Sequence, residues 1–235
     1  MRPIFIQYVA VWATAAICSC AAPAFGQMPG QGGMGRPSGM SRPSEEVQST
    51  PVEEKPDAAA TKAYTAGKKS LAKAKDFENA AAAAQNPDKR STALEKMGDA
   101  YNRALDQFTE ALSNKGDMYD AWNEVGYIHL RLGAYAESID DYNHTLALKP
   151  DLYEATFHRG EAYLATDRLE NTKSAYMDLF NHARPLADRL MVSMQNWLTV
   201  RRADSNGMRV ADVDAFDKWL QERDGIAKQT ASLPH

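Results

Sequence analysis

The side chains of this sequence that could do chemistry are few and widely separated. No two histidines stand four residues apart, the spacing that lets one helix hold a zinc ion. Neither Ser70 nor Ser174 lies in a recognisable nucleophile motif, and no glycine-rich phosphate loop follows a strand pattern. The adjacent carboxylates Asp140 and Asp141 are interpreted as solvated charges. We predict no catalytic residues, no metal site and no cofactor; an enzyme with an unfamiliar site is the remote alternative.

The cysteines, Cys18 and Cys20, lie in a segment typical of a secretory signal. Arg2 supplies the positive start, an apolar run follows, and small residues precede Gln27 as in a cleavage site. The apolar run is short for a membrane span. Residues 1–26 are therefore predicted to be a signal peptide. The mature protein would be exported to the periplasm and contain no cysteine.

Two alternatives for this segment remain open. It could stay attached as a membrane anchor. The residues before Cys20 also loosely resemble a bacterial lipobox, which would make Cys20 a lipidation site. The protein would contact a membrane through lipid only in that second case.

Composition limits the partners of the remaining chain. The sequence has 27 basic and 31 acidic residues and no basic stripe, so we predict no nucleic-acid binding. Residues 27–56 are rich in Gly, Pro, Ser and Met and contain no aromatic residue. Such a segment cannot bury enough apolar surface to offset the entropy of ordering, so we predict a disordered linker.

From about residue 58 the chain shows helical periodicity and no extended strand pattern. Asp57 is a candidate N-cap, and Asn86-Pro87 should separate two long helices. Gly133 and Asp167 are expected to form turns, and Pro185 is expected to follow a helix. The predicted helices span residues 58–85, 88–113, 119–132, 135–148, 153–166, 169–182, 186–203 and 209–228.

Two consecutive segments of this region repeat with a period of 34 residues. Gly126 and Gly160 stand 34 residues apart, as do Tyr142 and Tyr176. A glycine inside a helix costs about 1 kcal/mol relative to alanine, so its recurrence at one phase indicates close packing there. This period is typical of stacked helix pairs.

The repeated units, residues 119–152 and 153–186, resemble the tetratricopeptide repeat, here of an exported bacterial type. The second unit departs from the pattern, since Thr156 stands where the first has Trp122. Tyr101 and Phe108 match the second helix of an upstream unit. The residues that carry the resemblance by packing are Trp122, Gly126, Tyr135, Tyr142, Gly160, Tyr163 and Tyr176.

The resemblance implies an all-α, right-handed solenoid of antiparallel helix pairs. It would have about three units, and its C-terminal helices would cover the open end. The domain organisation then follows: an irregular first unit at 57–117, repeats at 119–152 and 153–186, capping helices at 187–229 and a tail at 230–235.

The resemblance also implies a concave groove formed by the first helices of successive pairs. Leu130 and Leu164 would line it unless they pack internally. Asn123, Tyr127, Phe157, His158 and Glu161 occupy phases where some relatives grip a partner's C-terminal carboxylate with basic residues, so that clamp is not expected here. The predicted groove residues are Asp120, Asn123, Tyr127, Arg131, Glu154, Phe157 and Glu161.

The predicted function is therefore a non-catalytic adaptor or scaffold in the cell envelope that binds a peptide or helix of another protein. The alternative is a structural envelope protein, lipidated at Cys20, that self-associates through its repeats.

Overall fold

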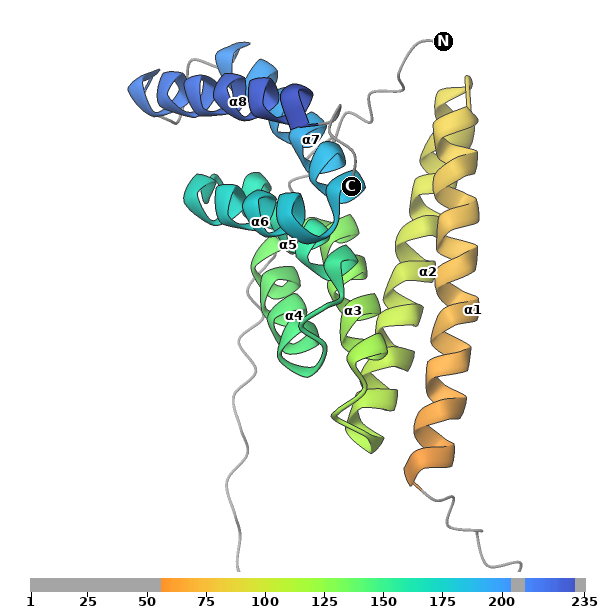
Figure 1. Ribbon diagram of the computed structural model, residues 1–235. Helices are drawn as coiled ribbons and strands as arrows, with labels where there is room; N and C mark the ends of the chain where they lie inside the picture. Colours follow the sequence, from red (N-terminus) through yellow and green to blue (C-terminus); the bar gives the residue numbers. More distant parts are fainter. Residues whose placement is uncertain (1–55, 204–209, 231–235) are drawn as a thin grey trace, which may run out of the picture. The chain divides into compact units, whose positions relative to one another are not determined.

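Eight α-helices make up residues 56–203 and 210–230, the part of the chain described by the computed structural model, and these ranges contain no β-strand (Figure 1). The predicted signal peptide with Cys20, the linker up to residue 55 and the tail beyond Thr230 lie outside the described residues. The helices are α1 (Pro56–Ala83), α2 (Pro87–Asn114), α3 (Tyr119–Leu132), α4 (Tyr135–Leu148), α5 (Tyr153–Ala165), α6 (Leu169–His182), α7 (Arg184–Ala203) and α8 (Val210–Thr230).

The turns between helices follow from local sequence chemistry. The Asn86 side chain caps α2 by accepting hydrogen bonds from the backbone N–H groups of Asp88 and Lys89, at 2.8 and 3.1 Å. Gly133 ends α3 with a left-handed backbone (φ 81°), and Asp167 adopts φ 58° between α5 and α6. These turns occur where the sequence predicts them.

Two predicted helix starts are wrong. Helix α1 begins at Pro56, so Asp57 lies in its first turn rather than at the N-cap. Helix α7 begins at Arg184, so Pro185 lies inside a helix rather than between two. Both positions fit proline, because the first-turn N–H groups of a helix have no intrahelical partner and their loss costs little.

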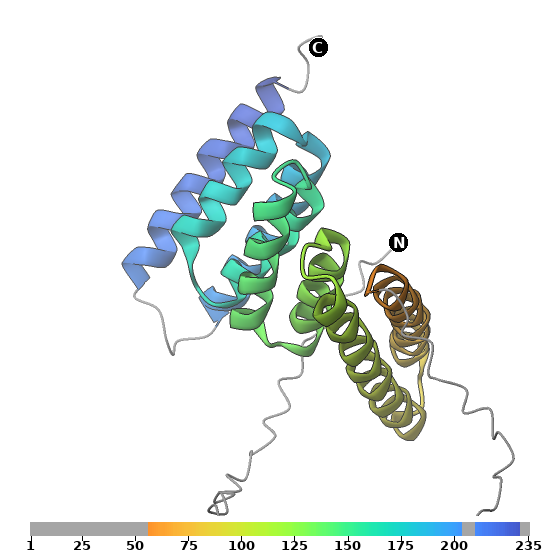
Figure 2. The ribbon, with the colours of Figure 1, turned by 90° about the horizontal axis from the view of Figure 1, so that it is seen from below.

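The helices pack as consecutive pairs: α1 with α2, α3 with α4, α5 with α6 and α7 with α8. The first helix of each later pair also packs on the pair before it, so α7 contacts both α5 and α6. Figure 2 shows the helices of the later pairs side by side. The chain therefore forms a stack of helix pairs, and α7 and α8 cover its end as a further pair.

The first pair is longer than the others. Helices α1 and α2 have 28 residues each, whereas α3 and α4 have 14, and the long pair stands at the right of Figure 1. The turn between them is Ala84–Asn86, since α1 continues through Ala83. The alanine run at residues 80–84 is thus mainly helix.

Aromatic side chains fill the space within and between pairs. Tyr101, Phe108, Tyr142 and Tyr176 are fully buried. Two large apolar side chains are exposed: Leu94 is 47 % exposed on α2, and Val210 is 76 % exposed at the start of α8.

Candidate functional site

The first helices of the pairs share a polar surface. At about 100° per residue, Asp120, Glu124, Tyr127 and Arg131 fall on one stripe of α3. A shift of 34 residues puts Glu154, His158 and Glu161 on the matching stripe of α5. We call the following set the first-helix face: Lys68, Lys75 and Glu78 of α1, Asp120, Glu124, Tyr127 and Arg131 of α3, Glu154, His158 and Glu161 of α5, and Ser193 of α7.

Helix α1 reaches α3 through charged side chains of this face. Lys68 Nζ lies 2.5 Å from Glu124 Oε1, and this hydrogen bond is the main cause that raises the pKa of Lys68. Lys75 Nζ lies 4.6 Å from the centre of the Tyr127 ring, a cation–π contact. Arg131 forms an ion pair with Glu78. These contacts fix the α1 edge of the face.

The same row of contacts continues across α5 to α7. The Tyr127 and His158 rings meet edge to face with centres 5.7 Å apart. His158 Nδ1 lies 3.0 Å from Glu161 Oε2, and Ser193 Oγ donates to Glu161 Oε1 at 3.3 Å. Side chains from all four first helices are thus linked into one row, from Lys75 to Ser193.

Two polar atoms near this row have no hydrogen-bond partner within the described residues: the Tyr142 hydroxyl and Asn123 Oδ1. The His158 ring stacks on the Tyr142 ring, with centres 6.1 Å apart. Burial raises the pKa of Tyr142 well above its usual value, and the nearby Glu161 carboxylate adds to this. An unpaired buried polar atom costs about 1–3 kcal/mol.

The structure separates the predicted groove residues into accessible and buried ones. Asp120 and Glu154 are exposed, and the rest are partly exposed, except Phe157. Phe157 is only 3 % exposed and lies under the Arg189 guanidinium, 4.3 Å from the ring centre, because α7 packs across α5. Its prediction as a groove residue is therefore wrong. Leu130 and Leu164 are buried as well.

The sequence did not predict the contribution of α1. Lys68, Lys75 and Glu78 were missed because α1 lacks the repeat signature that locates first helices. Their spacing of seven and three was the available signal, since it puts them on one side of a helix. Opposite charges at Glu124 and Arg131 could then have suggested the pairing.

The residues that carry the repeat resemblance have structural surroundings that explain their types. A β-carbon on Gly126 would lie 3.2 Å from the Tyr142 ring, and one on Gly160 would lie 2.9 Å from Leu190 Cδ2. Tyr142 and Tyr176 are fully buried, whereas Trp122, Tyr135 and Tyr163 are partly buried. These residues hold helices together, and the accessible polar row lies elsewhere.

Asp141 differs from its sequence interpretation as a solvated charge. It is 7 % exposed, and its Oδ2 lies 2.6 Å from His129 Nδ1. This hydrogen bond is the main cause that raises the pKa of His129. His129 lies on α3, and Asp141 lies 12 residues later on α4, so no local motif marks the pair.

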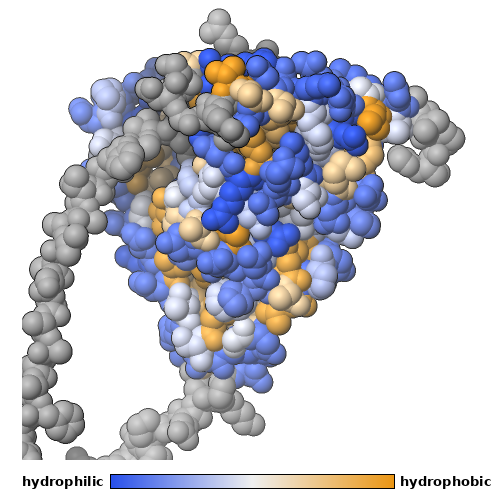
Figure 3. Space-filling model, turned by 90° about the vertical axis from the view of Figure 1, so that its left-hand side faces the viewer, coloured by the Kyte–Doolittle hydropathy of each residue, from blue (hydrophilic) through white to orange (hydrophobic). Residues whose placement is uncertain are grey.

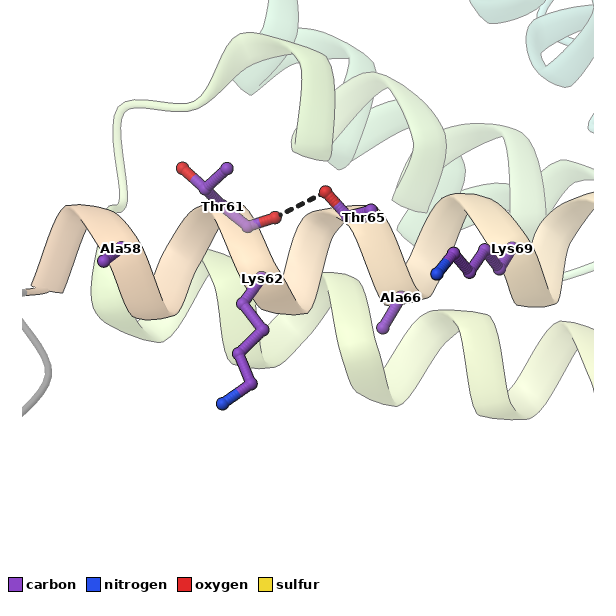
Figure 4. Close-up of a pocket in the computed structure, with 6 residues that line it drawn as sticks. All are labelled: Ala58, Thr61, Lys62, Thr65, Ala66 and Lys69. Atoms are coloured by element: carbon purple, nitrogen blue, oxygen red, sulfur yellow. Dashed lines mark hydrogen bonds between the residues drawn. The ribbon is translucent and has the colours of Figure 1, made fainter.

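A hollow on α1 offers no enclosed site for chemistry. Figure 4 shows a hollow whose lining residues all come from α1, where Thr65 Oγ1 donates to the Thr61 carbonyl oxygen at 2.8 Å. A hollow with walls from one helix cannot surround a substrate. No group of three or more His, Cys, Asp or Glu that could hold a metal occurs in residues 56–203 and 210–230.

The side of the molecule shown in Figure 3 is mostly polar. On the side shown in Figure 3, apolar residues form separate patches between hydrophilic ones. No helix among the described residues has both the length and the apolar character to span a bilayer.

No family model and no curated protein matches the sequence. Among solved structures, the TPR domain of Arabidopsis OM64 aligns with 68 % of this chain and 98 % of its own, at 12 % identity and a TM-score of 0.34.

Proposed function

We propose that this protein is a non-catalytic adaptor or scaffold that binds another protein through the first-helix face. The observation that carries the proposal is the continuous row of contacts from Lys75 on α1 to Ser193 on α7. It holds side chains of four helices in fixed positions. A stack of helix pairs offers such an extended surface for recognition.

The chemistry of the face favours a peptide or helix that carries both charge and apolar groups. Asp120 and Glu154 are exposed carboxylates, and Tyr127 is partly exposed. Tyrosine is enriched where partner proteins bind, because it combines a large apolar ring with a polar hydroxyl. Asn123, on α3 but outside the first-helix face, carries a buried amide oxygen that has no partner within the described residues.

A bare C-terminal carboxylate is a poor ligand for this face. Arg131 is already paired with Glu78, and Lys68 with Glu124. Breaking either pair to bind a new anion would leave a partly buried carboxylate uncompensated. Lys75, the third cation of the face, lies over the Tyr127 ring. The protein is therefore proposed to bind an internal segment of its partner.

The cellular setting of this proposal rests on residues 1–26. We place the protein in a bacterial cell envelope, exported by that segment and held at a distance by residues 27–56. The alternative is a lipid-anchored structural protein that self-associates. Mass spectrometry of the mature N-terminus separates them, because an acylated Cys20 supports the anchor and a free Gln27 supports export without it.

A pull-down from an envelope fraction tests the adaptor function. The double variant Asn123→Ala/Tyr127→Ala removes the Tyr127 ring from the face and the Asn123 amide from the same helix, and should recover less partner than the wild type. Asp140→Ala is the matched control, since Asp140 is exposed on α4, outside the face. Equal recovery of the same partner by all three proteins would contradict the assignment.

A further inference from the structure

A pocket of about 420 Å³ opens between α2, α3 and α4. Helices α2 and α4 each pack on α3 but not closely on each other, which leaves the space between them open. Trp122, Val125 and His129 of α3 line this pocket. At about 100° per residue they lie on the opposite side of α3 from the stripe of the first-helix face. The pocket is thus separate from the proposed protein-binding surface.

The pocket combines apolar walls with the hydroxyl side chains of Thr109 and Ser113 and one polar pair. Leu105 and Leu112 of α2 face Trp122 and Val125 of α3 across it. His129 and Asp141 also line it, joined by the 2.6 Å contact between Nδ1 and Oδ2. Small-molecule sites commonly have this composition: a mainly apolar hollow with a few polar groups in fixed positions.

Trp122 is itself held in position. Its indole N–H donates to the Gly116 carbonyl oxygen at 2.9 Å, and its ring stacks on His144 with centres 4.4 Å apart. An aromatic wall restrained in this way loses little entropy when a ligand packs on it.

The polar pair selects the ligand's functional group. His129 Nδ1 is already hydrogen-bonded to Asp141, which leaves Nε2 as the ring nitrogen for a ligand. A hydroxyl group suits both protonation states of the ring, because it accepts from a protonated Nε2 and donates to a neutral one. No lysine or arginine lines the pocket. The charge of a protonated His129 is already paired with Asp141. An anionic ligand would therefore lose hydration near Asp141 without gaining an unpaired cation.

We infer that this pocket binds a small uncharged molecule with an aromatic or similarly sized apolar body and one hydroxyl group. The apolar body lies among Leu105, Leu112 and Trp122, and the hydroxyl group hydrogen-bonds to His129 Nε2. This site needs no partner protein.

Nuclear magnetic resonance tests the site on the folded chain, with p-cresol as the probe. The signals to follow are the Trp122 indole N–H, assigned with Trp122→Phe, and the His129 ring. Thr109→Phe should block the pocket, because Thr109 lines it but is exposed, so the core is left alone. Glu110→Phe is the matched control, since Glu110 is the next exposed residue of α2 and does not line the pocket.

The wild type and Glu110→Phe should show saturable shifts of both signals with p-cresol. Thr109→Phe should bind about tenfold more weakly, or not at all, which corresponds to 1.4 kcal/mol or more. The anion p-toluate should also bind the wild type about tenfold more weakly. Absence of saturable shifts, equal affinity in Thr109→Phe, or equal affinity for p-toluate would each overturn the inference.

Tyr127→Ala separates this site from the proposed function. It removes a ring on the opposite side of α3, so p-cresol binding should be unchanged. A parallel loss of p-cresol binding in Tyr127→Ala would contradict the independence of the two surfaces.

Discussion

Gly160 of α5 lies directly against Leu190 of α7. A β-carbon at Gly160 would be 2.9 Å from Leu190 Cδ2, closer than real side chains approach one another. The contact joins one helix pair to the next. Gly160, which is recognised from its 34-residue spacing to Gly126, therefore sets how closely α7 can pack on α5. Gly126 has the same role within one pair, against Tyr142.

Gly160→Ala should therefore destabilise the protein. Overpacking a filled site costs about 1–3 kcal/mol, which outweighs the gain of about 1 kcal/mol in helix propensity. Gly98→Ala is the control, because no heavy atom lies within 4 Å of its would-be β-carbon and α2 should gain about 0.5–1 kcal/mol. Urea denaturation measures both; an equal gain in the two variants would show that Gly160 has free space.

Tyr142→Phe should leave the free energy of unfolding unchanged or raise it by up to about 1 kcal/mol, because it removes a buried hydroxyl that has no partner within the described residues. Tyr101→Phe gives the contrast: its hydroxyl donates to Glu78 at 2.9 Å, so its loss should cost about 1 kcal/mol. A clear destabilisation in Tyr142→Phe would indicate that its hydroxyl is paired.

The His129–Asp141 pair should make stability depend on pH. Folding raises the pKa of His129, chiefly through the hydrogen bond to Asp141, and Glu137 acts in the same direction. The stabilisation is complete below the unfolded pKa of about 6.5 and is lost as pH rises through the folded value. The loss should be about 0.5–1 kcal/mol, the size expected for a partly exposed pair.

Thermal denaturation from about pH 6 to pH 9, the window above the unfolded histidine pKa, measures this effect. His129→Gln should remove the decrease in stability seen in the wild type. A variant that keeps the same decrease would show that other groups cause it.

The Arg131–Glu78 pair should couple α1 to α3 measurably. Both side chains are about one-fifth exposed (18 % and 20 %), so solvent screens them less than a surface pair. A double-mutant cycle with Arg131→Gln and Glu78→Gln should give a coupling of about 1 kcal/mol. The exposed pair Lys228–Asp224 should give less than about 0.5 kcal/mol. Equal couplings would show that α1 is not held by this pair.

The sequence predicts the fold well because helix stacking has a strong periodic signal. The bounds of α3, α4 and α6 follow from apolar spacing and from turn residues such as Gly133 and Asp167. Prolines mislead in two places, because proline can begin a helix as well as end one. Pro56 and Pro185 both lie in first turns.

The site is less predictable because its residues meet across helices. Asp120, Tyr127 and Glu154 can be predicted from their positions in the 34-residue repeat alone. The structure puts them on accessible parts of the first helices. Phe157 has the same phase as Asn123 but is buried by α7, which lies beyond the repeated units. The burial of Asp141 depends on His129, a partner that no periodicity identifies.

Site-specific photo-crosslinking in cells tests the central claim most directly. A photoreactive phenylalanine analogue replaces Glu154, which is exposed on the first-helix face, or Asp140, which is exposed on α4 outside that face. We predict a discrete crosslinked protein adduct from position 154, lost when Tyr127→Ala is added, and none from position 140. The same adduct from both positions, or no adduct from position 154, would contradict binding through the first-helix face.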